Sequence, residues 1–214
     1  MSDVPIRIGV LALQGSFSEH MDAFRKLGVE AVEVRLPCGL EQVDGLVMPG
    51  GESTTILKLL DEYELRTPLL ERIHEGLPIL ATCAGTVCLA RNISSHDMSP
   101  LCVLDISVER NGFGRQVESF EEDLAIEELG GGVFRGVFIR APLIERCYGD
   151  ALVLARLSDG TIAGCREGNI IATAFHPEFV NDLRMHQYFV DCVRTWKASK
   201  TNVMKSSAAI DATS

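Results

Sequence analysis

The sequence has no surplus of basic residues and no long apolar run. Among its 214 residues, 20 are Lys or Arg and 30 are Asp or Glu, which gives a formal net charge of −10. An acidic chain is poorly suited to hold nucleic acid or anionic membranes by charge. No apolar stretch approaches the roughly 20 residues of a membrane helix, and the first residues lack the pattern of a signal peptide. We therefore expect a cytoplasmic protein that binds neither nucleic acid nor membranes.

The sequence also lacks the short motifs of several common sites. None of its seven cysteines forms a C-x-x-C pair, which argues against a zinc site or a redox pair. An odd number of cysteines without a secretory signal is typical of free thiols in a reducing compartment. Neither G-x-x-x-x-G-K-[ST] nor G-x-G-x-x-G occurs, so the phosphate loop and the dinucleotide fingerprint are both missing.

The composition is that of one globular domain. Hydrophobic residues make up 46% of the chain, which excludes disorder for most of it and allows a sizeable core without disulfides or metals. We find no internal repeat. From about Ser199 onward the residues are mainly Ser, Thr, Ala and Lys without periodicity. We predict one domain over residues 1–198 and a disordered tail over residues 199–214.

Strand and helix patterns alternate in the first half of the sequence. Four apolar runs are typical of buried parallel strands: residues 6–13, 44–48, 78–82 and 169–175. Helical patterns follow the first three, and the first helix has Ser16 and Glu19 at the spacing of a capping box. Three stretches contain the alternation of antiparallel strands: residues 101–109, 132–139 and 150–167. This order predicts an α/β fold with helices on both faces of the sheet.

One cysteine lies between a predicted strand and a predicted helix. Cys83 has small residues, Ala81 and Gly85, two positions to either side. Such residues permit a sharp turn that exposes the side chain between them, and the following helix N-terminus stabilises a thiolate and offers N–H groups to an oxyanion. Cys83 is therefore a candidate nucleophile. The alternative is a buried structural cysteine, which is the commonest role of this residue.

A histidine and a carboxylate follow the last buried strand. His176 lies at the end of that strand, and Glu178 is near enough in sequence to hold its imidazole. Because the carboxyl ends of parallel strands meet at one edge of a sheet, we expect His176 to lie near Cys83. A thiol, a histidine and an orienting carboxylate form a catalytic triad. The alternative is a capping histidine beside a solvated glutamate.

A glycine-rich loop at residues 49–54 follows the predicted strand of residues 44–48. Gly50 and Gly51 allow the backbone to turn and to approach a ligand closely. The loop N–H groups are candidates for a second oxyanion donor. A phosphate loop is the alternative, although its lysine is missing.

Taken in order, three motifs resemble those of class I, triad-type glutamine amidotransferases: Gly-Gly-Glu-Ser-Thr, Thr-Cys-Ala-Gly and His-Pro-Glu. Other segments are similar to the glutaminase subunits of pyridoxal 5′-phosphate synthases. These segments are residues 11–15 with Glu19 and His20, residues 108–116, residues 138–142 and residues 182–189. The resemblance covers about residues 5–196. The sequence departs from the family at Ala81, where a glycine is usual.

The resemblance implies a three-layer sandwich with a central mixed, mainly parallel sheet. It implies hydrolysis of L-glutamine to L-glutamate and ammonia, which passes to a separate synthase subunit that makes pyridoxal 5′-phosphate, or vitamin B6. Cys83 would attack the side-chain amide, His176 would transfer the protons, and Glu178 would orient His176. This chemistry requires neither a metal nor an organic cofactor.

The resemblance also assigns binding residues. The backbone N–H groups of Gly51 and Ala84 would form the oxyanion hole. The residues assigned to glutamine are Gly51, Glu52, Ser53, Arg110, Ile139 and Arg140. We expect the synthase subunit to contact the strand-end face of the sheet and the first helix near Glu19 and His20.

Three alternatives stay open from the sequence. A cysteine hydrolase such as a peptidase on the same fold would accept peptide amides. A non-catalytic binding module would keep the fold without the chemistry, although the intact triad argues against it. A glutaminase that serves another synthase differs only in the subfamily motifs.

Overall fold

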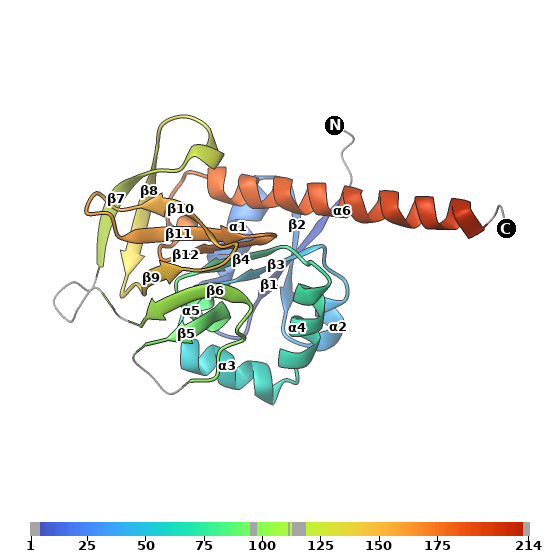
Figure 1. Cartoon of the computed structure of the whole chain (residues 1–214), viewed down its shortest axis with the longest axis horizontal. Coiled ribbons are helices and arrows are strands. Elements are labelled where there is room, and N and C mark those ends of the chain that lie inside the picture. The colour runs from blue at the N-terminus through green and yellow to red at the C-terminus, as the bar shows by residue number, and fades with distance from the viewer. Residues whose placement is uncertain (1–4, 95–97, 111, 113–118, 212–214) are drawn as a thin grey trace.

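The computed structural model describes residues 5–94, 98–110, 112 and 119–211. Its main element is a ten-stranded mixed sheet (Figure 1). In spatial order nine of its strands are β2 (Glu30–Val34), β1 (Arg7–Leu11), β3 (Gly45–Met48), β4 (Ile79–Thr82), β12 (Ile170–Thr173), β11 (Ile162–Glu167), β9 (Leu143–Cys147), β6 (Leu104–Glu109) and β5 (Ala90–Ile93). The tenth, β10 (Leu152–Arg156), pairs with β11.

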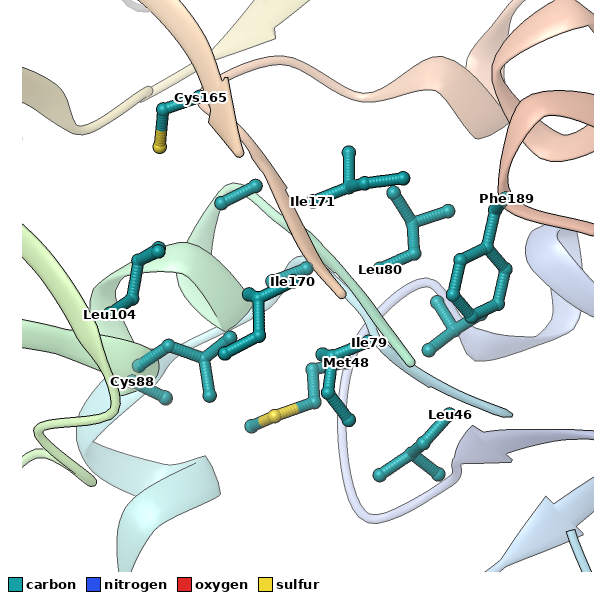
Figure 2. Packing of buried hydrophobic residues seen from close by; sticks show 14 of the residues in the cluster. Leu46, Met48, Ile79, Leu80, Cys88, Leu104, Cys165, Ile170, Ile171 and Phe189 are labelled. Atoms are coloured by element: carbon teal, nitrogen blue, oxygen red, sulfur yellow. The ribbon is translucent and has the colours of Figure 1, made fainter. Parts of the chain in front are cut away.

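The strands from β2 to β12 form the parallel half of the sheet. Every residue of β3, β4 and β12 is buried, as expected for strands covered on both faces. Figure 2 shows side chains of these three strands packed together in the core, with Phe189 and Cys88 against them. The sequence prediction of buried parallel strands at these places is confirmed.

Helices cover both faces of the parallel half (Figure 1). Helices α1 (Phe17–Lys26) and α6 (Arg184–Asp211) lie on one face, where the rings of Phe24 and Phe189 are 6.3 Å apart. Helices α3 (Ser53–Glu62), α4 (Arg66–His74) and α5 (Ala84–Leu89) lie on the other, together with the short α2 (Pro37–Leu40). The predicted three-layer arrangement is therefore confirmed.

The rest of the sheet is mostly antiparallel. Strand β11 runs antiparallel to β12, β9 and β10, and β9 runs antiparallel to β6. Strands β7 (Ser119–Ala125) and β8 (Val133–Ile139) form a separate antiparallel pair. Two single-turn helices complete the described elements, η1 (Glu127–Leu129) and η2 (Pro177–Phe179).

The structure differs from the sequence expectation at the last helix. Helix α6 continues to Asp211, so the backbone from Ser199 to that residue is helical. Figure 1 shows this end of α6 projecting past the other elements. Ala, Lys and Met favour helix, which explains how the helix continues where the apolar periodicity ends. Among the described residues, no helix combines the length and the apolar character that crossing a membrane requires.

Candidate active site

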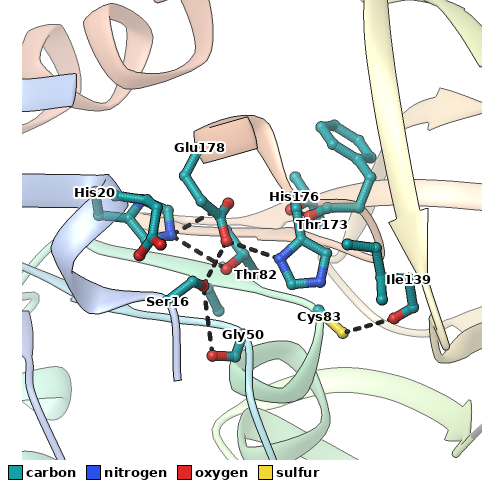
Figure 3. A network of polar contacts seen from close by, with 12 residues as sticks. Ser16, His20, Gly50, Thr82, Cys83, Ile139, Thr173, His176 and Glu178 are labelled. Atoms are coloured by element: carbon teal, nitrogen blue, oxygen red, sulfur yellow. Dashed lines mark hydrogen bonds and ion pairs between the residues drawn. The ribbon is translucent and has the colours of Figure 1, made fainter. Parts of the chain in front are cut away.

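The site lies at the carboxyl edge of the parallel half. Strands β1, β3, β4 and β12 all end there, and each leads into a loop that contributes one part of the site (Figure 3). In chain order these parts are Ser16, Gly50, Cys83 and His176. Because parallel strands all point the same way, segments far apart in the sequence meet at one edge.

Cys83 lies on a sharp turn between β4 and α5. Its φ angle is +46°, a conformation that non-glycine residues rarely adopt. The turn is held from both sides: the Cys83 N–H donates to the carbonyl of Thr173 at 2.8 Å, and the Thr86 hydroxyl donates to the same carbonyl at 2.8 Å. Gly85 is required here, since a Cβ at this position would lie 2.1 Å from the carbonyl oxygen of Met48. The predicted turn is thus present, and it stores backbone strain at the thiol.

His176 and Glu178 are joined directly. The imidazole Nδ1 and the carboxylate Oε1 are 2.7 Å apart, and both side chains are buried. The backbone N–H of His176 donates to the carbonyl of Val137 on β8 at 2.8 Å. The Phe179 ring stacks on the imidazole, with the ring centroids 5.1 Å apart. The histidine is therefore held at its backbone, at one ring nitrogen and at one ring face.

The electrostatics favour a charged imidazole. Burial opposes the charge on His176, but hydrogen bonds to Cys83 and Glu178 outweigh it and raise the pKa of His176 to about 10. Burial likewise opposes the charge on Glu178, but His20, His176 and Ser16 together lower its pKa to about 2. At neutral pH these pKa values support an imidazolium on His176 that is paired with the Glu178 carboxylate and faces Cys83.

Ser16 has a different role from the one its spacing predicts. It occupies the N-cap position of α1, yet its side chain makes no capping hydrogen bond, and the capping-box prediction is wrong. The Ser16 hydroxyl donates instead to Glu178 Oε1 at 2.6 Å. The hydroxyl turns toward the carboxylate, 162 residues away in sequence, because donating to a charged acceptor is stronger than accepting from the neutral helix N–H groups. Ser16 thus belongs to the site.

The glycine loop packs tightly against the site. A Cβ on Gly50 would lie 2.3 Å from Cε1 of His176, and a Cβ on Gly51 would lie 2.3 Å from Oε1 of Gln14. The loop that follows β1 holds the backbone of the glycine loop in place. The Ser16 N–H donates to the Gly50 carbonyl at 3.0 Å, and the Glu52 N–H donates to Gln14 Oε1 at 2.7 Å. A side chain at Gly50 would therefore displace the His176 ring, whereas one at Gly51 would require the Gln14 side chain to move.

The two residues predicted as oxyanion donors, Gly51 and Ala84, lie in the loops around Cys83. Ala84 is the first residue of α5, where the helix N–H groups have no acceptor within the helix. Gly51 follows Gly50, whose Cα faces the Cys83 side chain closely enough that an added Cβ would be 3.3 Å from it. The two N–H groups therefore come from separate loops that meet at Cys83.

Two of the residues assigned to glutamine are bound to each other. The Glu52 carboxylate caps α3 by accepting from the N–H groups of Thr54 and Thr55, at 3.3 and 3.0 Å, and it also pairs with Arg110. Although burial opposes the charge, hydrogen bonds from the Thr54 and Thr55 hydroxyls, and then from their backbone N–H groups, lower the pKa of Glu52 to about 2. Ser53 follows as the buried first residue of α3. The motif residues 111 and 113–116 lie outside the described residues.

The other two assigned residues end β8. The carbonyl of Ile139 lies 3.9 Å from the Cys83 Sγ, so this residue reaches the site through its backbone (Figure 3). Arg140 has a φ angle of +43° and an exposed side chain. A second strained non-glycine residue thus borders the site.

Two histidines that the sequence analysis does not assign to the site lie beside it in the structure. His20 and His186 are fully buried, and His20 approaches Glu178 to 3.3 Å. His20 follows the first buried strand by a few residues, which is the one signal that connects it with the strand-end edge. His20 is also too buried to form the surface contact expected of it.

Comparison with known proteins identifies the family. The model of the SNO glutamine amidotransferase family matches residues 10–195, which include every site residue named above. The chain belongs to this family. A crystal structure titled as a glutamine amidotransferase superposes on this amidotransferase with a TM-score of 0.82 at 49% identity, covering 87% of this chain and 98% of the other.

Curated relatives of this amidotransferase carry a more specific name. Pyridoxal 5′-phosphate synthase subunit PdxT of Pelotomaculum thermopropionicum is 52% identical over 196 residues, covering 91% of this chain and the whole relative. The protein of the same name from Dehalococcoides mccartyi strain CBDB1 is 49% identical over 195 residues, covering 90% of this chain and the whole relative. The likeness therefore extends over nearly the whole length of this amidotransferase.

Proposed function

We propose that this chain is the glutaminase subunit of a pyridoxal 5′-phosphate synthase, and that Cys83, His176 and Glu178 are its catalytic triad. The observation that carries the triad is the strained turn at Cys83, which meets a His176–Glu178 pair with a 2.7 Å contact. The relatives named as synthase subunits support the metabolic role.

The first half of the reaction forms a thioester. The Cys83 thiolate attacks the side-chain amide carbon of glutamine, and the oxygen becomes an oxyanion held by the N–H groups of Gly51 and Ala84. The His176 imidazolium then donates its proton to the nitrogen, and the C–N bond breaks to release ammonia. The raised pKa of His176 keeps this proton available at neutral pH.

The second half releases glutamate. The His176 imidazole, now neutral, takes a proton from water as the water oxygen attacks the thioester carbonyl. Collapse of the second tetrahedral intermediate expels the Cys83 thiolate and leaves His176 protonated, which restores the resting pair. Glu178 stabilises the imidazolium at both stages through its contact with Nδ1.

Substrate binding requires the Glu52–Arg110 pair to open or to bind glutamine as a unit. Arg110 suits the α-carboxylate, since a guanidinium binds a carboxylate through two hydrogen bonds. Glu52 keeps its charge in the site because of its low pKa, and it faces the α-ammonium. Ser53, Ile139 and Arg140 border the same space.

A partner subunit fits the surface around the triad. Phe179 and Ile139 flank the site, and 43% and 36% of their side chains are exposed. Exposed apolar side chains at a site opening are typical of surfaces that another protein covers. A synthase subunit seated there would receive ammonia before it reaches the solvent, and the acidic chain favours a partner surface that is partly basic.

The test follows nitrogen from substrate to product. The chain and a pyridoxal 5′-phosphate synthase subunit are mixed with amide-¹⁵N glutamine, and glutamate release and ¹⁵N in pyridoxal 5′-phosphate are measured. We expect rapid glutamate release only with the partner, and labelled product. Cys83→Ala should abolish both, whereas added ammonia should restore unlabelled product formation.

Two outcomes would contradict the proposal. Equal glutamate release with and without the partner indicates a free-standing amidase. Cleavage of peptide amides but not of free glutamine indicates a peptidase on the same fold.

A further inference from the structure

A buried row of polar side chains continues behind the triad carboxylate. His20 comes from α1 and His186 from α6, and neither side chain is exposed to solvent. The His20 Nδ1 and the His186 Nε2 are 2.9 Å apart. On its other side, the His20 Nε2 lies 3.3 Å from Glu178 Oε2 (Figure 3). The row thus runs from α6 through α1 to the triad.

The second oxygen of Glu178 depends on His20. The first oxygen, Oε1, accepts from Ser16 and His176. Oε2 is buried and has no well-directed hydrogen bond among the described residues, and His20 is the ion-pair partner recorded for it. A buried carboxylate oxygen without a donor is costly, so a small rotation that aligns the His20 N–H with Oε2 is favourable.

The Glu178 carboxylate beside His20 Nε2 and the orphaned His186 Nδ1 favour one arrangement of protons. A carboxylate only accepts, so His20 Nε2 carries the proton that faces Glu178. A neutral His20 then accepts at Nδ1, and the proton in that contact comes from His186 Nε2. This leaves His186 Nδ1 unprotonated, and that atom is the one without a hydrogen-bond partner in the described residues. An orphaned acceptor costs less than an orphaned N–H would.

His20 also touches the strand that leads to the nucleophile. Its Nε2 lies 3.3 Å from the hydroxyl oxygen of Thr82, the residue before Cys83. One imidazole therefore contacts both the carboxylate that orients His176 and the end of β4. A ring in this position sets the spacing between the two halves of the triad.

The surroundings keep both histidines neutral. Burial lowers the pKa of His20, against the charge of Glu178, and His176 and Glu19 act on it more weakly in opposite directions. Burial, reinforced by His20, lowers the pKa of His186 to about 3. The groups that face His20 are thus Glu178 and His176, His186 on α6, Thr82 on β4 and Glu19 on its own helix.

We propose that His20, supported by His186, is a positioning residue of the triad: its Nε2–H holds Glu178 Oε2, so that Oε1 stays on His176. The proposal rests on the proposed function, because it gives His20 a role in the same reaction. His20 touches no substrate atom and acts through Glu178.

Three variants separate positioning from packing. His20→Phe keeps the ring and removes both nitrogens, whereas His20→Gln restores an N–H donor toward Glu178. Phe24→Leu is the matched control, because the Phe24 ring packs against His186 at 5.2 Å but makes no polar contact in the row. Glutaminase activity is measured with saturating synthase subunit over a range of pH.

We expect His20→Phe to lower kcat about 10²-fold, the cost of a misplaced catalytic group, with little change in KM. Loss of an N–H donor to the Glu178 carboxylate should also raise the pKa of Glu178, so we expect the acid limb of the pH profile to move to higher pH. His20→Gln should recover most of kcat, and Phe24→Leu should lower only the Tm. Wild-type kcat and pH profile in His20→Phe would overturn the proposal.

A measurement on the wild-type chain tests the same point without a variant. Long-range ¹H–¹⁵N NMR of ¹⁵N-histidine protein reports which ring nitrogen carries the proton. We expect both His20 and His186 to be neutral with the proton on Nε2, and a proton on Nδ1 of His20 would overturn the proposal. If the wild-type chain released no glutamate with the partner, the proposed function would fail, and this spectrum would still decide the role of His20.

Discussion

The two halves of the sheet contribute to the site in different ways. The parallel half supplies side chains from four loops, including Cys83 and His176. The antiparallel half and the β7–β8 pair supply the Ile139 carbonyl, the Val137 carbonyl and the Arg110 side chain. Parallel strands end at one edge and bring several loops together, whereas antiparallel neighbours end at opposite edges. Chemistry therefore gathers at the parallel edge, and the other half positions and covers it.

The largest effect is expected at the thiol of the parallel half. Cys83→Ala should lower glutamate release by at least about 10⁴-fold, because the covalent route is lost, while the circular dichroism spectrum stays native. Cys88→Ala, in the helix that follows Cys83, is the control, and it should keep activity at a lower Tm, since its thiol lies in the core. Labelling of Cys88 or Cys165 by an electrophilic glutamine analogue would contradict the assignment.

A pair of glycine variants compares the two halves directly. Gly85→Ala should push α5 away from β3, since the new Cβ would meet the Met48 carbonyl oxygen at 2.1 Å. We expect a loss of about 1–3 kcal/mol in the free energy of unfolding together with most of the activity. Gly164→Ala on β11 meets its nearest atom at 3.4 Å and should change both quantities much less. Urea unfolding measures the free energy of unfolding, and glutamate release measures activity. Equal losses in Gly85→Ala and Gly164→Ala would contradict the difference expected between the two halves of the sheet.

The acid–base pair should leave a signature in stability. The lowered pKa of Glu178 stabilises the fold above pH 4.5 and ceases to do so as pH falls through about 2. The raised pKa of His176 stabilises it below pH 6.5, and this contribution is lost as pH rises through about 10. The difference in unfolding free energy between wild type and Glu178→Gln should therefore be largest between pH 4.5 and 6.5. A difference that grows toward pH 10 would contradict the ion pair.

The smallest effect is expected beyond both halves, at the end of α6. Removal of the residues after Lys200 should leave glutamate release unchanged and alter the unfolding free energy by less than about 0.5 kcal/mol. A helix that projects past the body has only its own propensity to hold it, so its amides should exchange quickly with solvent. Slow exchange in this segment would contradict that account and would indicate a binding partner.

Sequence reasoning found the elements that local pattern encodes. Buried runs such as residues 78–82 and the small residues around Cys83 predicted the strand, the turn and the helix that the structure contains. The helical pattern that follows residues 78–82 runs from residue 84 to residue 91, but α5 ends at Leu89 and β5 begins at Ala90, where it pairs with β6. Strand pairing is a tertiary event, and it overrode a local helical preference.

Ser16 and His20 show where local pattern stops being informative. The spacing of Ser16 and Glu19 is the same whether the serine caps a helix or binds a carboxylate, and only the position of Glu178 decides between them. The sequence around His20 likewise does not distinguish a structural histidine from one that contacts the site. Only its contacts with His186 and Glu178 in the folded chain do so.

The sequence by itself determined the α/β class and the parallel edge, and it singled out Cys83, His176 and Glu178 as candidates, because strand periodicity, turn-forming residues and ordered motifs are local properties. Tertiary structure alone decided the partners of those groups: which hydroxyl binds Glu178, which histidine stands behind it, and which acid pairs with Arg110. These contacts join residues tens to more than a hundred positions apart. They depend on the order in which the strands pack side by side, and no single segment of the sequence encodes that order.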